Sequence, residues 1–203
     1  MILQLTDKNI DEAIRSAITV LKNGGIVAYP TETFYALGVK YDIEPALKRL
    51  YEIKQRPKEK AMPLIIGRVE QLPLLTNCIS DSAKELMTKF WPGPLTILFN
   101  ARCGLSGYIT SGGKAAVRVP GESFALELAK TAEFPITATS ANISGMPPAD
   151  SASMITDYFD DAVDLIIDGG RTKGGLPSTI VYAAEGKIKI VRKGAADIQS
   201  NLI

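Results

Sequence analysis

Apolar residues in the first part of the chain recur at the spacing of one helix face. Between residues 10 and 21 they occupy Ile10, Ala13, Ile14, Ala17, Ile18 and Leu21. This spacing predicts an amphipathic helix, which Asn9 and Glu12 would begin as a capping box and Gly24-Gly25 would end. The apolar run that follows, from Ile26 to Tyr29, predicts a buried strand.

Helical and extended patterns continue to about residue 191. Helices are predicted over 46–54, 80–90, 123–131 and 151–159, with Pro45 in the first turn of one and Ser80 as the cap of another. Strands are predicted over 64–66, 95–99, 115–119, 136–139, 165–167, 179–182 and 188–191. Helices and strands alternate early and strands crowd together late, which predicts an α/β fold with a mixed sheet in one domain over residues 1–203. The glycine-rich stretch 101–114 is expected to be a mobile loop.

Composition excludes several classes of function. The formal charge is +1, so no global basic field indicates nucleic acid. The chain has no His, which removes the commonest acid-base side chain and any Ser-His triad. The two cysteines, Cys78 and Cys103, indicate neither a disulfide framework nor a zinc site. Acidic residues come too early for a signal peptide and no apolar run approaches the ~20 residues of a membrane span, so a cytoplasmic protein is expected.

A cluster of four cations follows the second predicted helix, at Lys54, Arg56, Lys58 and Lys60. Pro57 prevents the helix from continuing through it. One interpretation is a solvated basic loop. The other is an oxyanion clamp, because Arg offers phosphate or carboxylate a planar fork and Lys a point charge.

Arg118 stands in an otherwise apolar run from Ala115 to Pro120, where a cation is costly unless it is paired. It is an edge-strand residue facing water, a member of a buried ion pair, or a cation facing a cleft that receives a carboxylate.

Three further segments have the residue types of turns or of ligand contacts. Thr139-Ser140-Ala141-Asn142 and Pro30-Thr31-Glu32-Thr33 each follow a predicted strand, where they form plain turns or present donors in a fixed direction. Gly169-Gly170 and Gly174-Gly175 bracket a basic stretch but match no phosphate-loop pattern, which favours a flexible hairpin connection.

The order and spacing of these segments carry a family resemblance. They are Pro30-Thr31-Glu32-Thr33 with Tyr35 and Leu37-Gly38, Lys54-x-Arg56-Pro57, Pro63-Leu64, Trp91-Pro92-Gly93-Pro94-Leu95-Thr96, Arg118-Val119-Pro120, Thr139-Ser140-Ala141-Asn142-Ile143-Ser144-Gly145, Pro177-Ser178-Thr179 and Arg192-Lys193-Gly194. In them the chain resembles the YrdC family of L-threonylcarbamoyladenylate synthases, in its short, single-domain form.

The resemblance implies a fold, a reaction and partners. The fold would be a twisted mixed sheet flanked by helices, with a basic concave ligand-binding face. The reaction would be that of a nucleotidyltransferase, which makes threonylcarbamoyl-AMP from L-threonine, bicarbonate and ATP and releases pyrophosphate. The product would serve threonylcarbamoyl modification of tRNA adenosine-37, with tRNA or the transfer machinery as candidate partners and no membrane.

The resemblance also implies roles, position by position. Threonine would be held by Thr33, Arg118, Ser140 and Ser178, with Arg118 facing its carboxylate. ATP would be held by Lys54, Arg56, Lys60, Lys114, Asn142, Asp150, Ser151 and Arg192. No covalent nucleophile and no protein ligand to a metal are expected. Lys54 and Arg56 would stabilise charge, and Mg²⁺ would share the phosphate charge. Gly67 stands where many members have His, which leaves one threonine-side contact unfilled or supplied by another group.

Two other functions remain as alternatives. One is an RNA-binding module that uses the same basic concave face without catalysis, against which the near-zero net charge weighs. The other is a related carbamoyl-adenylate chemistry, as in the YrdC-like domain of hydrogenase maturation proteins, which join several domains including Cys-rich zinc modules.

Overall fold

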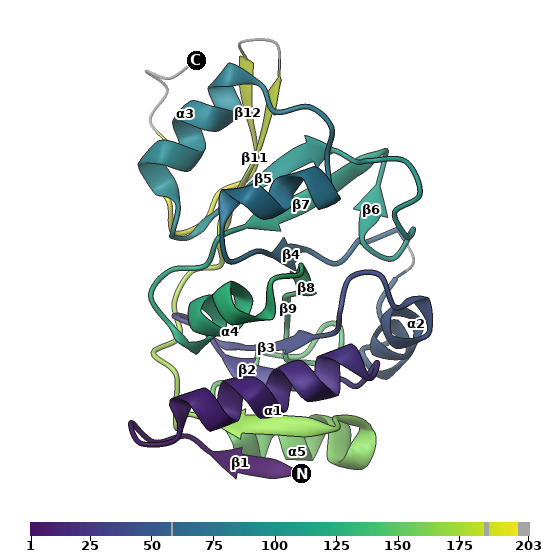
Figure 1. Cartoon of the computed structure of the whole chain (residues 1–203), viewed down its shortest axis with the longest axis vertical. Helices are drawn as coiled ribbons and strands as arrows, with labels where there is room; N and C mark the ends of the chain where they lie inside the picture. The colour runs from purple at the N-terminus through teal and green to yellow at the C-terminus, as the bar shows by residue number, and fades with distance from the viewer. Residues whose placement is uncertain (58, 185–186, 199–203) are drawn as a thin grey trace.

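The computed structural model describes residues 1–57, 59–184 and 187–198, which form two sheets one above the other in Figure 1. The first sheet has the order β1 (Ile2–Gln4), β10 (Leu165–Asp168), β2 (Val27–Pro30), β3 (Tyr35–Gly38) and β9 (Thr139–Ser140). The second has the order β12 (Lys187–Arg192), β11 (Thr179–Ala184), β5 (Leu95–Asn100), β7 (Lys114–Arg118), β4 (Leu64–Ile65) and β8 (Ile136–Thr137), with β6 (Thr110–Ser111) beside β7.

Both sheets are mixed, as predicted. In the first sheet β10 is parallel to β1 and β2, whereas β3 is antiparallel to β2 and β9. In the second, β11 runs parallel to β5 and antiparallel to β12. The predicted single sheet is thus divided in two, and β8 and β9 pass from one sheet to the other across Ala138.

Helices cover both faces of the first sheet (Figure 1). On one face lie α1 (Ile10–Lys22) and α4 (Phe124–Ala132), and on the other α2 (Glu44–Ile53) and α5 (Ala152–Phe159). Neighbouring residues of β2 divide accordingly, because Val27 and Tyr29 join the α1/α4 core while Ala28 joins the opposite core. This two-sided burial explains why the run reads as continuously apolar.

The second sheet is covered by α3 (Asp81–Phe90), whose Leu86 joins the same buried cluster as Ile97 and Val181. Ser80 caps α3 as predicted, because its Oγ accepts a hydrogen bond from the backbone N–H of Ala83 at 3.2 Å. Two short 3₁₀ helices, Val69–Leu74 and Asp160–Ala162, complete the regular structure of the described residues.

Two local predictions are wrong. The Asn9 side chain makes no capping bond, since its Oδ1 accepts from the backbone N–H of Thr6 at 2.7 Å instead. The stretch 169–175 is not a hairpin, because it connects β10 in one sheet to β11 in the other. It is tied to the turn between β2 and β3 by a 2.8 Å hydrogen bond from the Gly174 N–H to the Thr33 carbonyl. The loop predicted over 101–114 contains the short strand β6.

Gly67 lies against the backbone of helix α4. A Cβ atom placed at Gly67 would come within 2.4 Å of the Lys130 Cα and N atoms, closer than nonbonded atoms approach. Any larger residue therefore requires α4 to move. In this chain position 67 supplies close helix packing, and a histidine at 67 does not fit beside α4 as it stands.

A Gly67→Ala variant should therefore lose stability. Overpacking at a rigid backbone contact costs about 1–3 kcal/mol in the free energy of unfolding. Gly107→Ala is the matched control, because a Cβ there meets nothing within 4 Å. Urea unfolding of both variants measures the difference, and equal midpoints would show that α4 yields at no cost.

Candidate active site between the two sheets

A cavity of about 530 Å³ lies between the two sheets and draws its lining from both. Hydroxyl groups and three guanidinium groups surround it. The polar residues of the lining include Thr31, Thr33, Arg56, Thr96, Arg118, Thr139, Ser140, Ser178 and Arg192. Of the twelve positions expected to bind ligand, the structure brings six to this cavity: Thr33, Arg56, Arg118, Ser140, Ser178 and Arg192.

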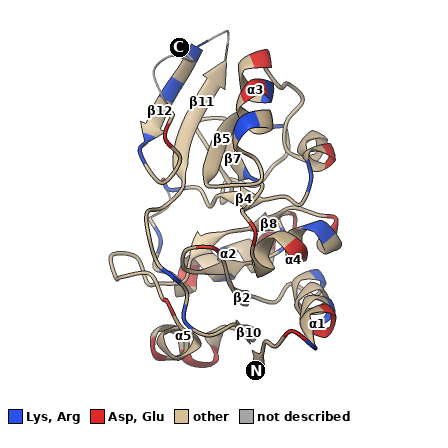
Figure 2. Cartoon of the chain, turned by 90° about the vertical axis from the view of Figure 1, so that its left-hand side faces the viewer, with Lys and Arg blue, Asp and Glu red and all other residues tan. Residues whose placement is uncertain are grey.

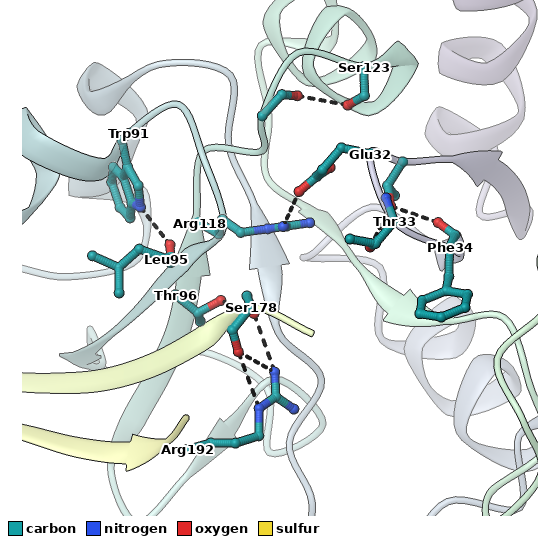
Figure 3. Close-up of polar contacts among 12 residues, drawn as sticks. Glu32, Thr33, Phe34, Trp91, Leu95, Thr96, Arg118, Ser123, Ser178 and Arg192 are labelled. Atoms are coloured by element: carbon teal, nitrogen blue, oxygen red, sulfur yellow. Dashed lines mark hydrogen bonds and ion pairs between the residues drawn. The ribbon is translucent and has the colours of Figure 1, made fainter. Parts of the chain in front are cut away.

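The turn between β2 and β3 presents two threonine hydroxyls. The Thr31 hydroxyl donates to the Phe34 carbonyl at 2.7 Å and accepts from the Thr33 backbone N–H at 3.2 Å, so it fixes the turn locally. The Thr33 hydroxyl contacts only the Thr31 hydroxyl, at 3.2 Å, among the described residues. Thr33 therefore keeps hydrogen-bonding capacity for a ligand (Figure 3).

Arg118 ends β7, an interior strand between β5 and β4, so the edge-strand interpretation is wrong. Its side chain is 13% exposed, and its Nη1 donates to the Glu32 Oε1 at 2.5 Å. It also lines the cavity. Arg118 therefore forms an ion pair and also faces the cavity, and its role in receiving a carboxylate stays a prediction.

Ser178 and Arg192 form one hydrogen-bonded group with a residue that the sequence analysis did not assign, Thr96. The Thr96 and Ser178 hydroxyls lie 2.8 Å apart, and Arg192 Nη2 donates to the Ser178 carbonyl at 2.8 Å (Figure 3). Burial, and then the charge of Arg118, lowers the pKa of Arg192. Thr96 directly follows a Pro-Gly-Pro-Leu turn at the start of β5, which was the available signal.

Arg56 reaches the cavity from the segment after α2. Its Nε donates to the Lys60 carbonyl at 2.7 Å and its Nη2 to the Ala61 carbonyl at 2.9 Å. Its Nη1 lies 3.5 Å from the Thr139 hydroxyl at the cavity wall. Backbone carbonyls of the same basic segment thus hold the Arg56 side chain in place. Lys58 lies outside the described residues.

Lys54, which was expected to face the phosphates, is buried and does not line the cavity. It is 1% exposed, and its Nζ donates to the carbonyl oxygens of Ser140 and Asn142 at 2.5 and 2.6 Å. Burial, and then the charge of Arg56, lowers the pKa of Lys54 to about 7. Lys54 therefore holds the loop that carries Ser140 and does not line the cavity itself.

The remaining expected nucleotide contacts lie outside the cavity lining. The Lys114 Nζ lies 4.8 Å from the centroid of the Tyr182 ring. The Asn142 amide donates to the Met146 carbonyl at 2.6 Å, and Asp150 pairs with Arg171 at 3.5 Å. Ser151 contacts the Ser153 hydroxyl at 3.1 Å, and the Lys60 carbonyl accepts from Arg56 and from the Tyr51 hydroxyl. Their roles stay predictions.

Charge elsewhere is mixed in sign. Figure 2 shows basic and acidic positions together on α1 and α3, whereas β12 carries only basic ones. The expected basic concave face stays a prediction, although three arginines line the cavity. Within the described residues, no group of three or more Cys, Asp or Glu side chains is placed to hold a metal, and no helix is long and apolar enough to cross a membrane.

The buried Lys54 should give the stability of the protein a specific pH dependence. The unfolded chain keeps this proton up to the ordinary pKa of 10.5, whereas the folded chain releases it near 7. Between these values the unfolded state binds more protons, so the free energy of unfolding rises with pH. Relative to a Lys54→Met variant, the wild type should gain up to about 1.4 kcal/mol per pH unit above about pH 7.5.

Denaturant unfolding at several pH values between about 7.5 and 9.5 measures this difference. Lys48→Met, at an exposed position of α2, is the control and should show no such slope. A constant difference between wild type and Lys54→Met would mean that Lys54 stays charged throughout.

Comparison with known proteins places the chain in a family. A family model for Sua5, YciO and YrdC, described as telomere recombination, matches residues 19–194. The threonylcarbamoyl-AMP synthase of Pyrococcus abyssi is 36% identical over 200 residues, which cover 98% of this chain and 59% of the relative. That of Klebsiella pneumoniae is 37% identical over 180 residues, which cover 87% of this chain and 94% of the relative. The chain thus spans little more than half of the first relative.

Solved structures give the same result. The crystal structure of P. abyssi Sua5 complexed with L-threonine matches with a TM-score of 0.89 and 37% identity, covering 96% of this chain and 57% of that one. The crystal structure of Escherichia coli YciO matches with a TM-score of 0.83 and 26% identity, covering 97% of this chain and 96% of that one. With the family model extending over most of its length, the chain belongs to the Sua5/YciO/YrdC family.

Proposed function

We propose that this protein is a nucleotidyltransferase that makes threonylcarbamoyl-AMP from L-threonine, bicarbonate and ATP and releases pyrophosphate. The observation that carries the proposal is the convergence of Arg56, Arg118 and Arg192 with several hydroxyl groups on one cavity. Relatives named threonylcarbamoyl-AMP synthase and a Sua5 structure with L-threonine support it.

The chemistry requires positioning and charge neutralisation. The threonine amine and bicarbonate form a carbamate with loss of water. A carbamate oxygen then attacks the α-phosphorus of ATP, and the bond to pyrophosphate breaks. The reactants carry several negative charges and include their own nucleophile, so aligned cations and donors can supply much of the rate enhancement.

The cavity residues divide between the two substrates. Arg118 would receive the threonine carboxylate, since an arginine fork matches a carboxylate in a two-point contact. The hydroxyls of Thr33, Ser140 and Ser178 would orient the rest of the amino acid. Arg56 and Arg192 would face the phosphates of ATP, and Mg²⁺ would enter with the nucleotide and share its charge.

Lys54 would contribute by fixing the shape of the site. Its two hydrogen bonds to carbonyls of the 140–142 loop hold Ser140 at the cavity wall. A displacement of about 1 Å in a positioning residue can cost on the order of 100-fold in rate where orientation is the main catalytic device. The product would serve threonylcarbamoyl modification of tRNA adenosine-37.

The decisive assay is pyrophosphate release from ATP. Release should require threonine and bicarbonate together, because the carbamate that attacks ATP forms only from both. Omitting either substrate is the control. Turnover that ignores threonine would contradict the threonine assignment, and salt-sensitive RNA binding without ATP turnover would favour the RNA-binding alternative.

A further inference from the structure

One ion pair joins the two sheets beside the cavity. Glu32 lies in the turn after β2, in the first sheet, and Arg118 ends β7 in the second. Their 2.5 Å contact is the only ion pair that a cavity-lining residue makes within the described residues. Neither the residue pattern nor the family resemblance implied a role for Glu32.

Glu32 lies beside Arg118 without itself lining the cavity. Its side chain packs near Gly121, where an added Cβ would lie 3.7 Å from the Glu32 Cγ. Figure 3 shows the carboxylate meeting one end of the guanidinium group, between the turn that bears Thr33 and the turn that bears Ser123. The carboxylate therefore meets Arg118 at one terminal nitrogen, from a residue that does not line the cavity.

The contact leaves most of the arginine fork free. A guanidinium group has five N–H donors in a fixed plane. In the described part of the chain, Glu32 is the only hydrogen-bond partner of the Arg118 guanidinium, through Nη1. The Nε and Nη2 donors remain for a carboxylate, and the anchored Nη1 removes rotamers that a long side chain would otherwise sample.

Glu32 is also the charged partner of one of the three cavity arginines. Burial, and then the nearby charge of Arg118, lowers the pKa of Arg192. Arg56 and Arg192 are held by backbone carbonyls, at Ala61 and Ser178 respectively. Arg118 is held by a full negative charge, which offsets repulsion within the cavity and fixes its direction.

We propose that Glu32 is a positioning residue, which holds Arg118 so that the free edge of its guanidinium faces the substrate carboxylate. The proposal rests on the proposed function, since it takes that carboxylate to be threonine's. It opposes a placeholder model, in which Glu32 occupies the substrate's position on Arg118 and leaves when threonine binds. The two models predict opposite effects when Glu32 is removed.

The test is calorimetric titration of L-threonine into the purified chain without ATP. Glu32→Ala should raise the dissociation constant of threonine about tenfold, because Arg118 would no longer be held in position for its charge-assisted contact with the carboxylate. Glu32→Gln, which keeps the shape and an acceptor oxygen, should fall between Glu32→Ala and wild type. Glu122→Ala, at an exposed position of the nearby turn, is the control and should match wild type. Unchanged or tighter binding by Glu32→Ala would overturn the proposal.

A second titration shows whether Glu32 acts through Arg118. In an Arg118→Lys background, adding Glu32→Ala should change the dissociation constant by less than about twofold, because residues acting as a unit are not additive. A further tenfold loss would show that Glu32 acts by another route and overturn the proposal. Wild type that binds threonine but releases no pyrophosphate would contradict the proposed function while leaving the titrations to decide on Glu32.

Discussion

Three guanidinium groups of like charge point into one cavity, and the rest of the site depends on how each is held there. Like charges repel in a partly buried space, where screening by water is weak. Arg56 and Arg192 are fixed by backbone carbonyl oxygens, and Arg118 by the carboxylate of Glu32. Each anchor takes some of the N–H donors and leaves the remainder for an anionic ligand. These contacts stabilise the three positive charges near one another and fix the direction in which each guanidinium group points.

The fold supplies these anchors from both sheets. Arg118 comes from the second sheet and Glu32 from the turn after the first, so the anchor also joins the two halves of the molecule. Lys54 also fixes part of the site, because its buried Nζ donates hydrogen bonds to two carbonyls of the loop that bears Ser140. Gly67 permits α4 to pack against the strand segment beside the cavity. The site is therefore built from backbone geometry as much as from side-chain identity.

Periodicity predicted the long elements because their burial is one-sided or complete. In α1 and β2 the apolar side chains are spaced so that only one type of local structure can bury them, and both elements form as predicted. The short strand β3 was missed, and β9 was predicted only as the end of one strand over 136–139, because the pairing of Ala36 with Ser140 joins residues far apart in sequence. The division of the strands into two sheets also could not be predicted from local sequence patterns, because strand pairing depends on tertiary context.

Residue types and family resemblance identified much of the candidate site but not the direction of each side chain. Arg118, Ser140 and Ser178 line the cavity as expected. Lys54 does not, because its Nζ donates instead to the carbonyl oxygens of Ser140 and Asn142. Glu32 received no role, because a carboxylate is an unexpected neighbour for an anionic substrate until its ion pair with Arg118 is known.

A crystal structure of this chain with L-threonine bound would test most directly the claim that anchored arginines present their free edges to the ligands. We expect the threonine carboxylate within about 3 Å of Arg118, on the side of the guanidinium away from Glu32, and we expect the Glu32–Arg118 contact to persist. Threonine bound away from Arg118, or Glu32 displaced from it by the ligand, would contradict this claim.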